Sequence, residues 1–451
     1  MNIPNIVYIH AHDLGRYCEP MGHAIPAPNL MRLAQQGVLF RQCHAAAPSC
    51  APSRAALFSG QHPHVCGMIG LPSQHLGYTM RDYGLHLSAW LRAQGYETAL
   101  AGVQHEAHLP FADPRQVLGY DRFLNHEARG HQNFDVRLTV PTAVDYLAEA
   151  HQRPFFLSVG LVDPHRDNRG DRRVFVESQP QRQPADIDER ARYCPPFPHL
   201  PDNAITRREM ANFRHGVELM DGDIGRLLAA LDAPELRRNT LVIFSSDHGP
   251  GVCEMKCTLS DRGTGVVLIM RGPSDPACGP AALFAGGQVN DALVQHLDLY
   301  PTIAEVAGRM VPAHCQGSSL LPLLRDGREA IHERIFTEQT YHWNGEPRPL
   351  RAVRTARWKY IRSWRADQPR GADRGPAEEL LQQHGYATRP WPDESLHDLL
   401  FDPHEAGNLA GDPACAEVLA GLRSDLEAWM RSTGDPLLHG IPPPPVRSTS
   451  A

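Results

Sequence analysis

The chain has 451 residues, about three times the ~150 residues that one domain usually takes, so one large domain with a smaller partner is expected. Hydrophobic residues make up 42% and charged residues 21%, which supports a buried core and excludes disorder throughout the chain. Asp plus Glu exceed Lys plus Arg by 51 to 44, and a net charge of -7 argues against a general binder of nucleic acids or membrane surfaces. The 25 histidines and 10 cysteines direct attention to metal, proton-transfer and thiol chemistry.

The first residues show no targeting signal. Met1 leads within a few residues into the apolar run 5–10, without a basic region, a long apolar segment or a cleavage site. No stretch approaches the ~20 apolar residues of a membrane span. We therefore expect a cytoplasmic protein without membrane contact, in which most cysteines are small buried hydrophobes.

Short, nearly continuous apolar runs alternate with longer helical patterns along the first 330 residues. The runs cover residues 6–10, 38–43, 98–102, 155–161, 241–244 and 266–270. Strands that lack polar alternation are expected where helices cover both faces of a sheet. The pattern predicts an α/β fold with a large mixed, mostly parallel sheet sandwiched by helices, and ligands in such folds bind beyond the carboxyl ends of the strands.

Two segments between these runs have a clear character of their own. Residues 206–231 carry apolar side chains at steps of three and four, and Thr206 with Glu209 has the form of a capping box at the start of this helix. The proline-rich and charged residues 178–201 predict a long surface loop at the rim of the molecule.

The character of the chain changes after residue 324. Short strands are predicted at 335–340, 351–354 and 359–364, then a polar loop at 366–378 and a last helix near 417–431. We therefore predict a catalytic α/β domain over residues 1–329 and a C-terminal α+β subdomain over 330–439. The proline-rich tail 440–451 is expected to be extended or disordered.

Cys50 lies in a turn that precedes the apolar start of a helix, within the string Pro-Ser-Cys-Ala-Pro-Ser-Arg of residues 48–54. Backbone N–H groups and the positive end of the helix dipole favour an anion at this place, and Arg54 follows one turn later. The position suits a nucleophile that attacks an anionic ester. A thiol buried under a helix cap would show the same local pattern.

The string Cys-x-Pro-Ser-Arg, followed by Gly60, resembles the signature of type I sulfatases of the alkaline phosphatase superfamily. In that family a maturation enzyme oxidises the cysteine to Cα-formylglycine, whose hydrate is the nucleophile. The resemblance implies that Cys50 is the precursor of this nucleophile and that Arg54 assists it. In their order and their residues, the motifs resemble most the heparan N-sulfatase (sulfamidase) branch of the family.

The resemblance continues at the ends of two predicted strands. His12 and Asp13 stand where the family usually has two aspartates, and Asp247 and His248 end the second metal-binding strand. The resemblance implies that these residues and Cys50 hold a divalent cation. Ca²⁺ is expected, with Mn²⁺ or Zn²⁺ as rivals because two imidazoles replace oxygen ligands. Read by their local sequence alone, the residues after these strands are equally consistent with helix caps.

Three further residues match family positions beside the substrate. The resemblance implies that Lys256 binds the sulfate, that His165 protonates the leaving oxygen or nitrogen, and that His105 acts as a base in product release. The family pattern Gly-Lys-x-His is broken, because Val103 stands where the lysine is expected. One cation of the usual sulfate site is therefore missing.

The predicted function is hydrolysis of a sulfate ester or sulfamate, on a sulfated sugar such as glucosamine sulfate. One alternative keeps the superfamily and changes the substrate to a phosphonate monoester or a phosphodiester. A second alternative is a catalytically impaired homologue that binds an anion or a sugar. The retained Cys50 argues against this second alternative, because a binding protein needs no oxidisable cysteine.

Overall fold

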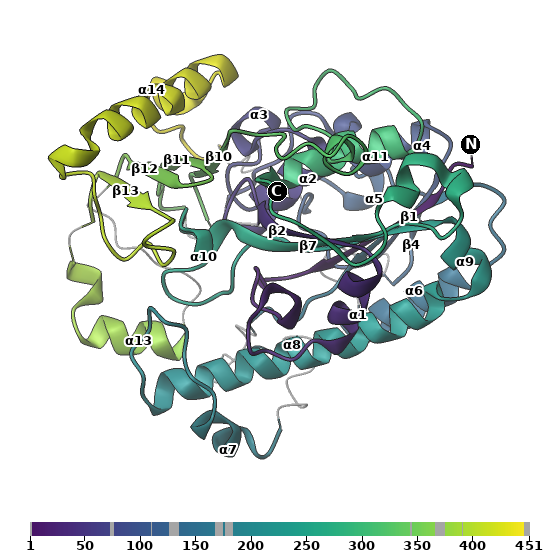
Figure 1. Cartoon of the computed structure of the whole chain (residues 1–451), viewed down its shortest axis with the longest axis horizontal. Coiled ribbons are helices and arrows are strands. Elements are labelled where there is room, and N and C mark those ends of the chain that lie inside the picture. The colour runs from purple at the N-terminus through teal and green to yellow at the C-terminus, as the bar shows by residue number, and fades with distance from the viewer. Residues whose placement is uncertain are drawn as a thin grey trace, which may run out of the picture.

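A computed structural model of the chain describes residues 2–72, 76–109, 111–125, 135–166, 175, 184–342, 345–365, 375–389 and 391–445. Figure 1 shows a large sheet between two layers of helices, with a smaller sheet beside one end. The strands of the large sheet are β1 (Asn5–Ala11), β2 (Val38–His44), β3 (Glu97–Gly102), β4 (Arg122–Phe123), β5 (Phe155–Gly160), β6 (Thr240–Ser246), β7 (Gly265–Arg271), β8 (Gln288–Asn290) and β9 (Val294–Gln295).

The large sheet is mixed and mostly parallel, as predicted. Its order is β4-β3-β5-β1-β6-β7-β2-β8, with β9 also paired to β2. The strands from β4 to β6 are parallel, whereas β7 is antiparallel to both of its neighbours. Because β1 and β6 pair from Asn5 with Thr240 to Ala11 with Ser246, the turns that follow both strands lie side by side.

Alternate residues of β1 enter two separate cores. Val7 and Ile9 pack under α1 (Pro28–Gln36), α6 (Thr139–Leu147) and the long α8 (Ala204–Leu231), seen below the sheet in Figure 1. Ile6 and Tyr8 pack against the opposite layer. That layer includes α2 (Cys50–Ser59), α4 (Leu87–Ala93) and α11 (Leu299–Val306). Burial on both faces accounts for the continuous apolar runs in the sequence.

The second sheet is antiparallel and four-stranded. It runs in the order β10 (Arg334–Gln339), β11 (Leu350–Thr355), β12 (Trp358–Ser363) and β13 (Glu394–Asp398). Helix α14 (Ala416–Thr433) packs on it, so that Leu422 and Trp429 share a core with Val353 and Tyr360. The sheet and its helix match the predicted α+β character, and the division of the chain at residue 329 stays a prediction.

The remaining helices are short. They are α3 (Pro63–Cys66), α5 (Pro114–Val117), α7 (Ile187–Arg192), α9 (Pro234–Asn239), α10 (Asp261–Thr264), α12 (Leu321–Arg325) and α13 (Pro376–Gln383). No helix in the described ranges is long and apolar enough to cross a bilayer.

The predicted capping box of α8 is wrong. Asn203 caps this helix by accepting hydrogen bonds from the backbone N–H groups of Ile205 and Thr206, and Thr206 completes the box. Glu209 instead accepts hydrogen bonds from the Arg166 guanidinium and from the backbone N–H of Ala377. A tertiary contact therefore uses the carboxylate that the local pattern assigned to the cap.

The loop predictions need two corrections. The segment 178–201 contains α7, which buries Ile187 and Ala191, and α13 begins inside the predicted loop 366–378. Both helices are short and are held by contacts with α8, so their own sequences give a weak signal. Residues 178–183, 366–374 and the tail from 446 onward lie outside the described residues.

Candidate active site

Backbone N–H groups of the turn after β1 donate hydrogen bonds to side-chain oxygens at the end of β6 and in the turn that follows it. Ser246 Oγ accepts hydrogen bonds from the N–H groups of Leu14 and Gly15, at 3.0 and 3.1 Å. The Asp13 N–H donates to Asp247 Oδ1 at 2.9 Å, and Asp13 itself adopts a left-handed φ of 59°. A non-glycine residue in this conformation is held there by its surroundings and is common at functional sites.

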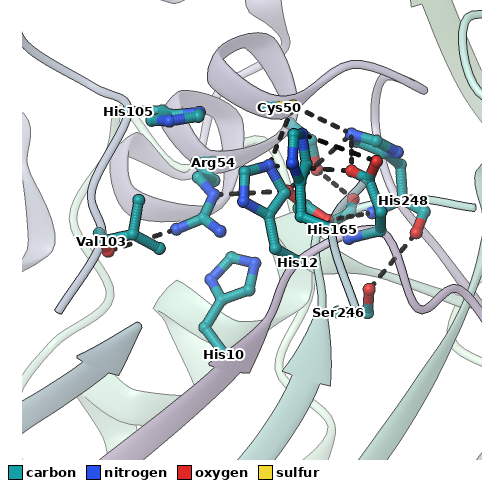
Figure 2. A network of polar contacts seen from close by, with 12 residues as sticks. His10, His12, Cys50, Arg54, Val103, His105, His165, Ser246 and His248 are labelled. Atoms are coloured by element: carbon teal, nitrogen blue, oxygen red, sulfur yellow. Dashed lines mark hydrogen bonds and ion pairs between the residues drawn. The ribbon is translucent and has the colours of Figure 1, made fainter. Parts of the chain in front are cut away.

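Cys50 begins helix α2 directly above these turns (Figure 2). Its side chain is buried, with Sγ 3.1 Å from His12 Nε2 and 3.3 Å from His248 Nε2. Ser53 holds the helix in place by donating a hydrogen bond to the Asp247 carbonyl oxygen at 2.6 Å. The thiol predicted to be the nucleophile precursor therefore lies between the imidazoles of two strand ends.

The predicted metal ligands converge on one point. His12 Nε2 lies 3.4 Å from Asp247 Oδ2, and His248 Nε2 lies 3.4 Å from Asp13 Oδ1. Ligand atoms held about 2.0–2.5 Å from one cation stand roughly 3–4 Å from each other, so this donor set fits a single ion. His248 Nδ1 is 2.8 Å from the Gly249 carbonyl, an arrangement that leaves the Nε2 lone pair for a cation.

Burial and charge act against each other in this cluster. Burial raises the pKa of Asp247, but His248, Arg54 and His10 outweigh it, so the pKa of this carboxyl is lowered from its ordinary value. Burial lowers the pKa of His12 and of His248. These directions favour an ionised Asp247 carboxylate and neutral imidazoles at His12 and His248, the protonation states of metal ligands.

Two buried cations flank the carboxylates. Arg54 Nε lies 3.4 Å from Asp247 Oδ2, and Lys256 Nζ lies 3.0 and 3.2 Å from the two oxygens of Asp13. Burial lowers the pKa of Arg54, but Asp247 and Glu106 raise it above the ordinary value, so the guanidinium keeps its charge. Val103, in place of the expected lysine, contributes only its carbonyl, 3.5 Å from Arg54 Nη1.

His165 and His105 lie on the more open side of the site. The ring centre of His165 is 4.2 Å from that of His12, and the ring centre of His105 is 5.0 Å from it. Both side chains are half-buried, whereas those of His12 and Cys50 are buried. The structure thus brings all the predicted site residues together, and their individual roles stay predictions. They are His12, Asp13, Cys50, Arg54, His105, His165, Asp247, His248 and Lys256.

Two residues beneath the site add to this picture. His10 lies on β1 two residues before His12 (Figure 2), and its Nδ1 lies 2.9 Å from the Tyr8 hydroxyl. Glu106 was missed, since no motif marks it. Its carboxylate is buried, accepts a hydrogen bond from the His105 N–H at 2.9 Å, and has a raised pKa because burial outweighs the Arg54 charge.

Residues 4–309, which make up more than half of the chain, match the sulfatase family. The chain belongs to the sulfatase family. Residues 279–370 of this sulfatase also match the family described as N-sulphoglucosamine sulphohydrolase, C-terminal. The predicted family, hydrolase class and fold are therefore confirmed.

Curated relatives cover almost the whole sulfatase chain. N-sulphoglucosamine sulphohydrolase of Homo sapiens is 28% identical, across 92% of this chain and 87% of its own. Delta 4,5-hexuronate-2-O-sulfatase of Bacteroides thetaiotaomicron is 26% identical, across 96% of this chain and 90% of its own. The first of these agrees with the predicted branch of the family.

Solved structures share the fold of this sulfatase. A 2-O GAG sulfatase has a TM-score of 0.72 at 23% identity, with 97% of this chain and 94% of that chain covered. Another solved protein, in complex with its substrate D-glucosamine-2-N,6-O-disulfate, has a TM-score of 0.70 at 18% identity, with 96% of this chain and 99% of that chain covered.

Proposed function

We propose that this protein hydrolyses the sulfate ester or sulfamate of a sulfated saccharide, with N- or O-sulfated glucosamine as the expected substrate. The observation that carries the proposal is the position of Cys50 Sγ, which lies 3.1 and 3.3 Å from the imidazole nitrogens of His12 and His248. In the active protein Sγ stands for a hydroxyl oxygen of the formylglycine hydrate. A maturation enzyme of the formylglycine-generating class is thus a required partner.

The donor set fits one divalent cation. His12, Asp13, Asp247 and His248 would hold it next to residue 50. A cation bound there would neutralise sulfate charge and favour ionisation of the nucleophile. We propose Ca²⁺ as the ion, with Mn²⁺ or Zn²⁺ as rivals, since the two imidazole nitrogens favour a transition metal. Elemental analysis of protein purified without added metal distinguishes them without reference to activity.

Arg54 and Lys256 provide the fixed positive charge of the site. A sulfate monoester carries its negative charge on oxygens that shield the sulfur, so a nucleophile approaches only where that charge is neutralised. The Lys256 ammonium contacts Asp13 from the side of the loop 250–257, and Arg54 contacts Asp247 from helix α2. The two side chains therefore approach the nucleophile from different elements, as a clamp on sulfate oxygens requires.

His165 is the proposed general acid. Its Nε2 lies 3.8 Å from Asp13 Oδ2, on the more open side of the cluster. When the S–O or S–N bond breaks, the leaving saccharide takes a proton, and His165 is positioned to supply it. His105 lies on the other side of His12 and is the proposed base for product release.

The relatives support a saccharide substrate and favour sulfatase chemistry over the two alternatives. The curated relatives named above carry N-sulphoglucosamine and hexuronate in their names, and one solved structure holds a disulfated glucosamine. Val103 removes one cation from the expected sulfate site, so we expect a narrower substrate range than the family pattern would give.

A hydrolysis panel tests the proposal. Matured protein is assayed against N-sulfoglucosamine, O-sulfated glucosamines, an aryl sulfate, an aryl phosphonate monoester and a phosphodiester. We expect release of sulfate from at least one glucosamine sulfate with the highest kcat/KM of the panel. A higher kcat/KM on the phosphonate or phosphodiester would replace the proposal with the alternative hydrolase. No turnover by fully matured protein would favour the binding homologue.

A further inference from the structure

A cavity of about 570 Å³ lies between the large domain and the second sheet. Glu254 and Thr258, which lie two residues on either side of Lys256, form part of its wall on the catalytic side. Ser395 and His397 of β13 line it from the second sheet. None of the proposed catalytic or metal-binding residues lines the described part of this cavity, so it is distinct from the Cys50 site.

The cavity combines an apolar surface with polar groups. Trp391, Leu350 and Ile361 contribute apolar surface. His397 Nδ1 lies 2.8 Å from the Gly407 carbonyl, which leaves Nε2 as an acceptor for a hydroxyl group. Its size falls within the ~300–1,000 Å³ typical of ligand sites. An indole surface beside hydroxyl-binding groups suits a sugar ring, which has apolar C–H faces and polar edges.

Two glutamates and two arginines line the cavity, and one of the arginines is available to an anion. The Glu405 carboxylate is already engaged, since it lies 2.9 Å from Lys359 Nζ and accepts a hydrogen bond from the Asp261 N–H at 2.7 Å. Glu254 lies 3.8 Å from the Arg262 guanidinium. The exposed Arg389 side chain, by contrast, makes no hydrogen bond or ion pair with the described part of the chain. Its guanidinium is the positive charge left over for a ligand.

We propose that this cavity binds a sulfated saccharide unit, so that a sulfated oligosaccharide has a second binding site besides the one at Cys50. The choice of ligand rests on the proposed function. Arg389 would bind the sulfate or carboxylate group, and Trp391 would contact the sugar face. A sulfated oligosaccharide that occupies this cavity, alone or together with the Cys50 site, is therefore expected to bind more tightly than a single sugar.

Equilibrium binding tests the proposal without turnover. Full-length Cys50→Ala protein is titrated with a sulfated glycosaminoglycan tetrasaccharide, the same tetrasaccharide without sulfate, and inorganic sulfate. Adding Arg389→Glu should weaken binding of the sulfated tetrasaccharide about tenfold, the loss expected for one charge-assisted contact. Arg153→Glu is the matched control, because this exposed arginine lies just before the amino end of β5, whereas the loop after β6 that lines the cavity lies at the carboxyl ends of the strands, so binding should be unchanged.

The other outcomes each overturn the proposal. Unchanged tetrasaccharide binding in Arg389→Glu would show that the cavity takes no sulfated sugar. Inorganic sulfate that binds as tightly as the tetrasaccharide would reduce the site to an anion site. Tight binding of the unsulfated tetrasaccharide that is insensitive to Arg389→Glu would remove the role of charge.

Kinetics then separate this proposal from the proposed function. In the matured enzyme, Arg389→Glu should raise KM for the tetrasaccharide more than KM for a sulfated monosaccharide, and equal effects would contradict a separate site. If tetrasaccharide binding depends on Arg389 and no sulfatase activity is found, the proposed function alone fails. If sulfate is released and binding ignores Arg389, the second site alone fails.

Discussion

Two buried clusters of ionisable side chains differ in how their members are bonded. Around Cys50, donor atoms of two histidines and two carboxylates face one point at separations of 3.4 to 3.8 Å. The second cluster centres on Arg351, whose guanidinium bonds both oxygens of Asp435 at 2.5 and 3.0 Å and lies 3.2 Å from Glu338. His64 completes it, with Nδ1 2.6 Å from the same Glu338 carboxylate.

The two clusters share residue types and differ in chemistry. His64, Glu338 and Asp435 lie close enough together to hold a metal ion, as do the residues around Cys50. In the second cluster the Arg351 guanidinium lies between the carboxylates, and its bidentate bonds satisfy them. It joins α3, β10, β11 and the segment after α14, so we interpret it as a structural cross-link. Around Cys50, Lys256 and Arg54 also contact the carboxylates. The imidazole nitrogens of His12 and His248 nevertheless both face Cys50 Sγ, and this convergence on one point marks the site of chemistry.

The largest expected effect is at Cys50. Cys50→Ala should lower kcat by at least about 10⁴-fold, because it removes the precursor of the nucleophile. Cys66→Ala is the matched control, since Cys66 is an equally buried thiol in α3, and it should keep its activity. Sulfate release is measured for both variants after each is produced together with a formylglycine-generating enzyme, and retained turnover in Cys50→Ala would contradict the assignment.

The next largest effect on activity is expected for a substitution of Lys256. Lys256→Met keeps the length and apolar stem of the side chain and removes its charge, so kcat/KM for a sulfate ester should fall about 10²–10³-fold. The melting temperature is measured alongside, because Lys256 also pairs with Asp13. A fall in melting temperature with normal kcat/KM would make Lys256 a structural partner of Asp13 only.

His165 should show a dependence on the leaving group. His165→Gln removes the proposed proton donor and should lower kcat about 10²-fold for a saccharide sulfate, whose leaving group needs the proton. An aryl sulfate, which leaves as a stable phenolate, should lose much less. Equal losses on both substrates would exclude general acid catalysis by this residue.

A substitution in the cluster around Arg351 should lower the stability of the folded protein. Arg351→Met leaves two buried carboxylates without their cation and should lower the free energy of unfolding by about 3–5 kcal/mol. Arg41→Met is the control, because the exposed Arg41 makes a similar bidentate pair with the exposed Asp291 and should change stability very little. Denaturant unfolding measures both, and similar losses would refute the distinction between buried and exposed pairs.

The smallest effect concerns pH. Burial raises the pKa of Glu338, but His64 and Arg351 outweigh it and lower the pKa to about 2. The unfolded carboxyl titrates near 4.3, so this stabilisation is complete above that pH and is lost as pH falls towards 2. The difference in unfolding free energy between the native protein and Glu338→Gln should thus be constant from pH 8 to 5 and shrink below pH 4. A constant difference down to pH 3 would contradict the lowered pKa.

The sequence predicted the site better than its surroundings. His12, Asp13, Asp247 and His248 follow strands that pair in parallel, so their proximity could be inferred from strand ends and motifs. The partners of His64 could not, because Glu338 is 274 residues away and no local pattern joins them. Helices α7 and α13 and strand β13 were missed for the same reason, since neighbouring elements hold these short segments in place.

The central claim is that residue 50, once oxidised, is the nucleophile of a sulfatase. The most direct test prepares the protein with and without a formylglycine-generating enzyme, measures the converted fraction of Cys50 by peptide mass spectrometry, and measures sulfate release from N-sulfoglucosamine or another active substrate of the panel on the same samples. We predict that kcat, calculated per total protein, rises in proportion to the converted fraction of Cys50 and approaches zero when no Cys50 is converted. Equal turnover by protein whose Cys50 is wholly unconverted would contradict the claim.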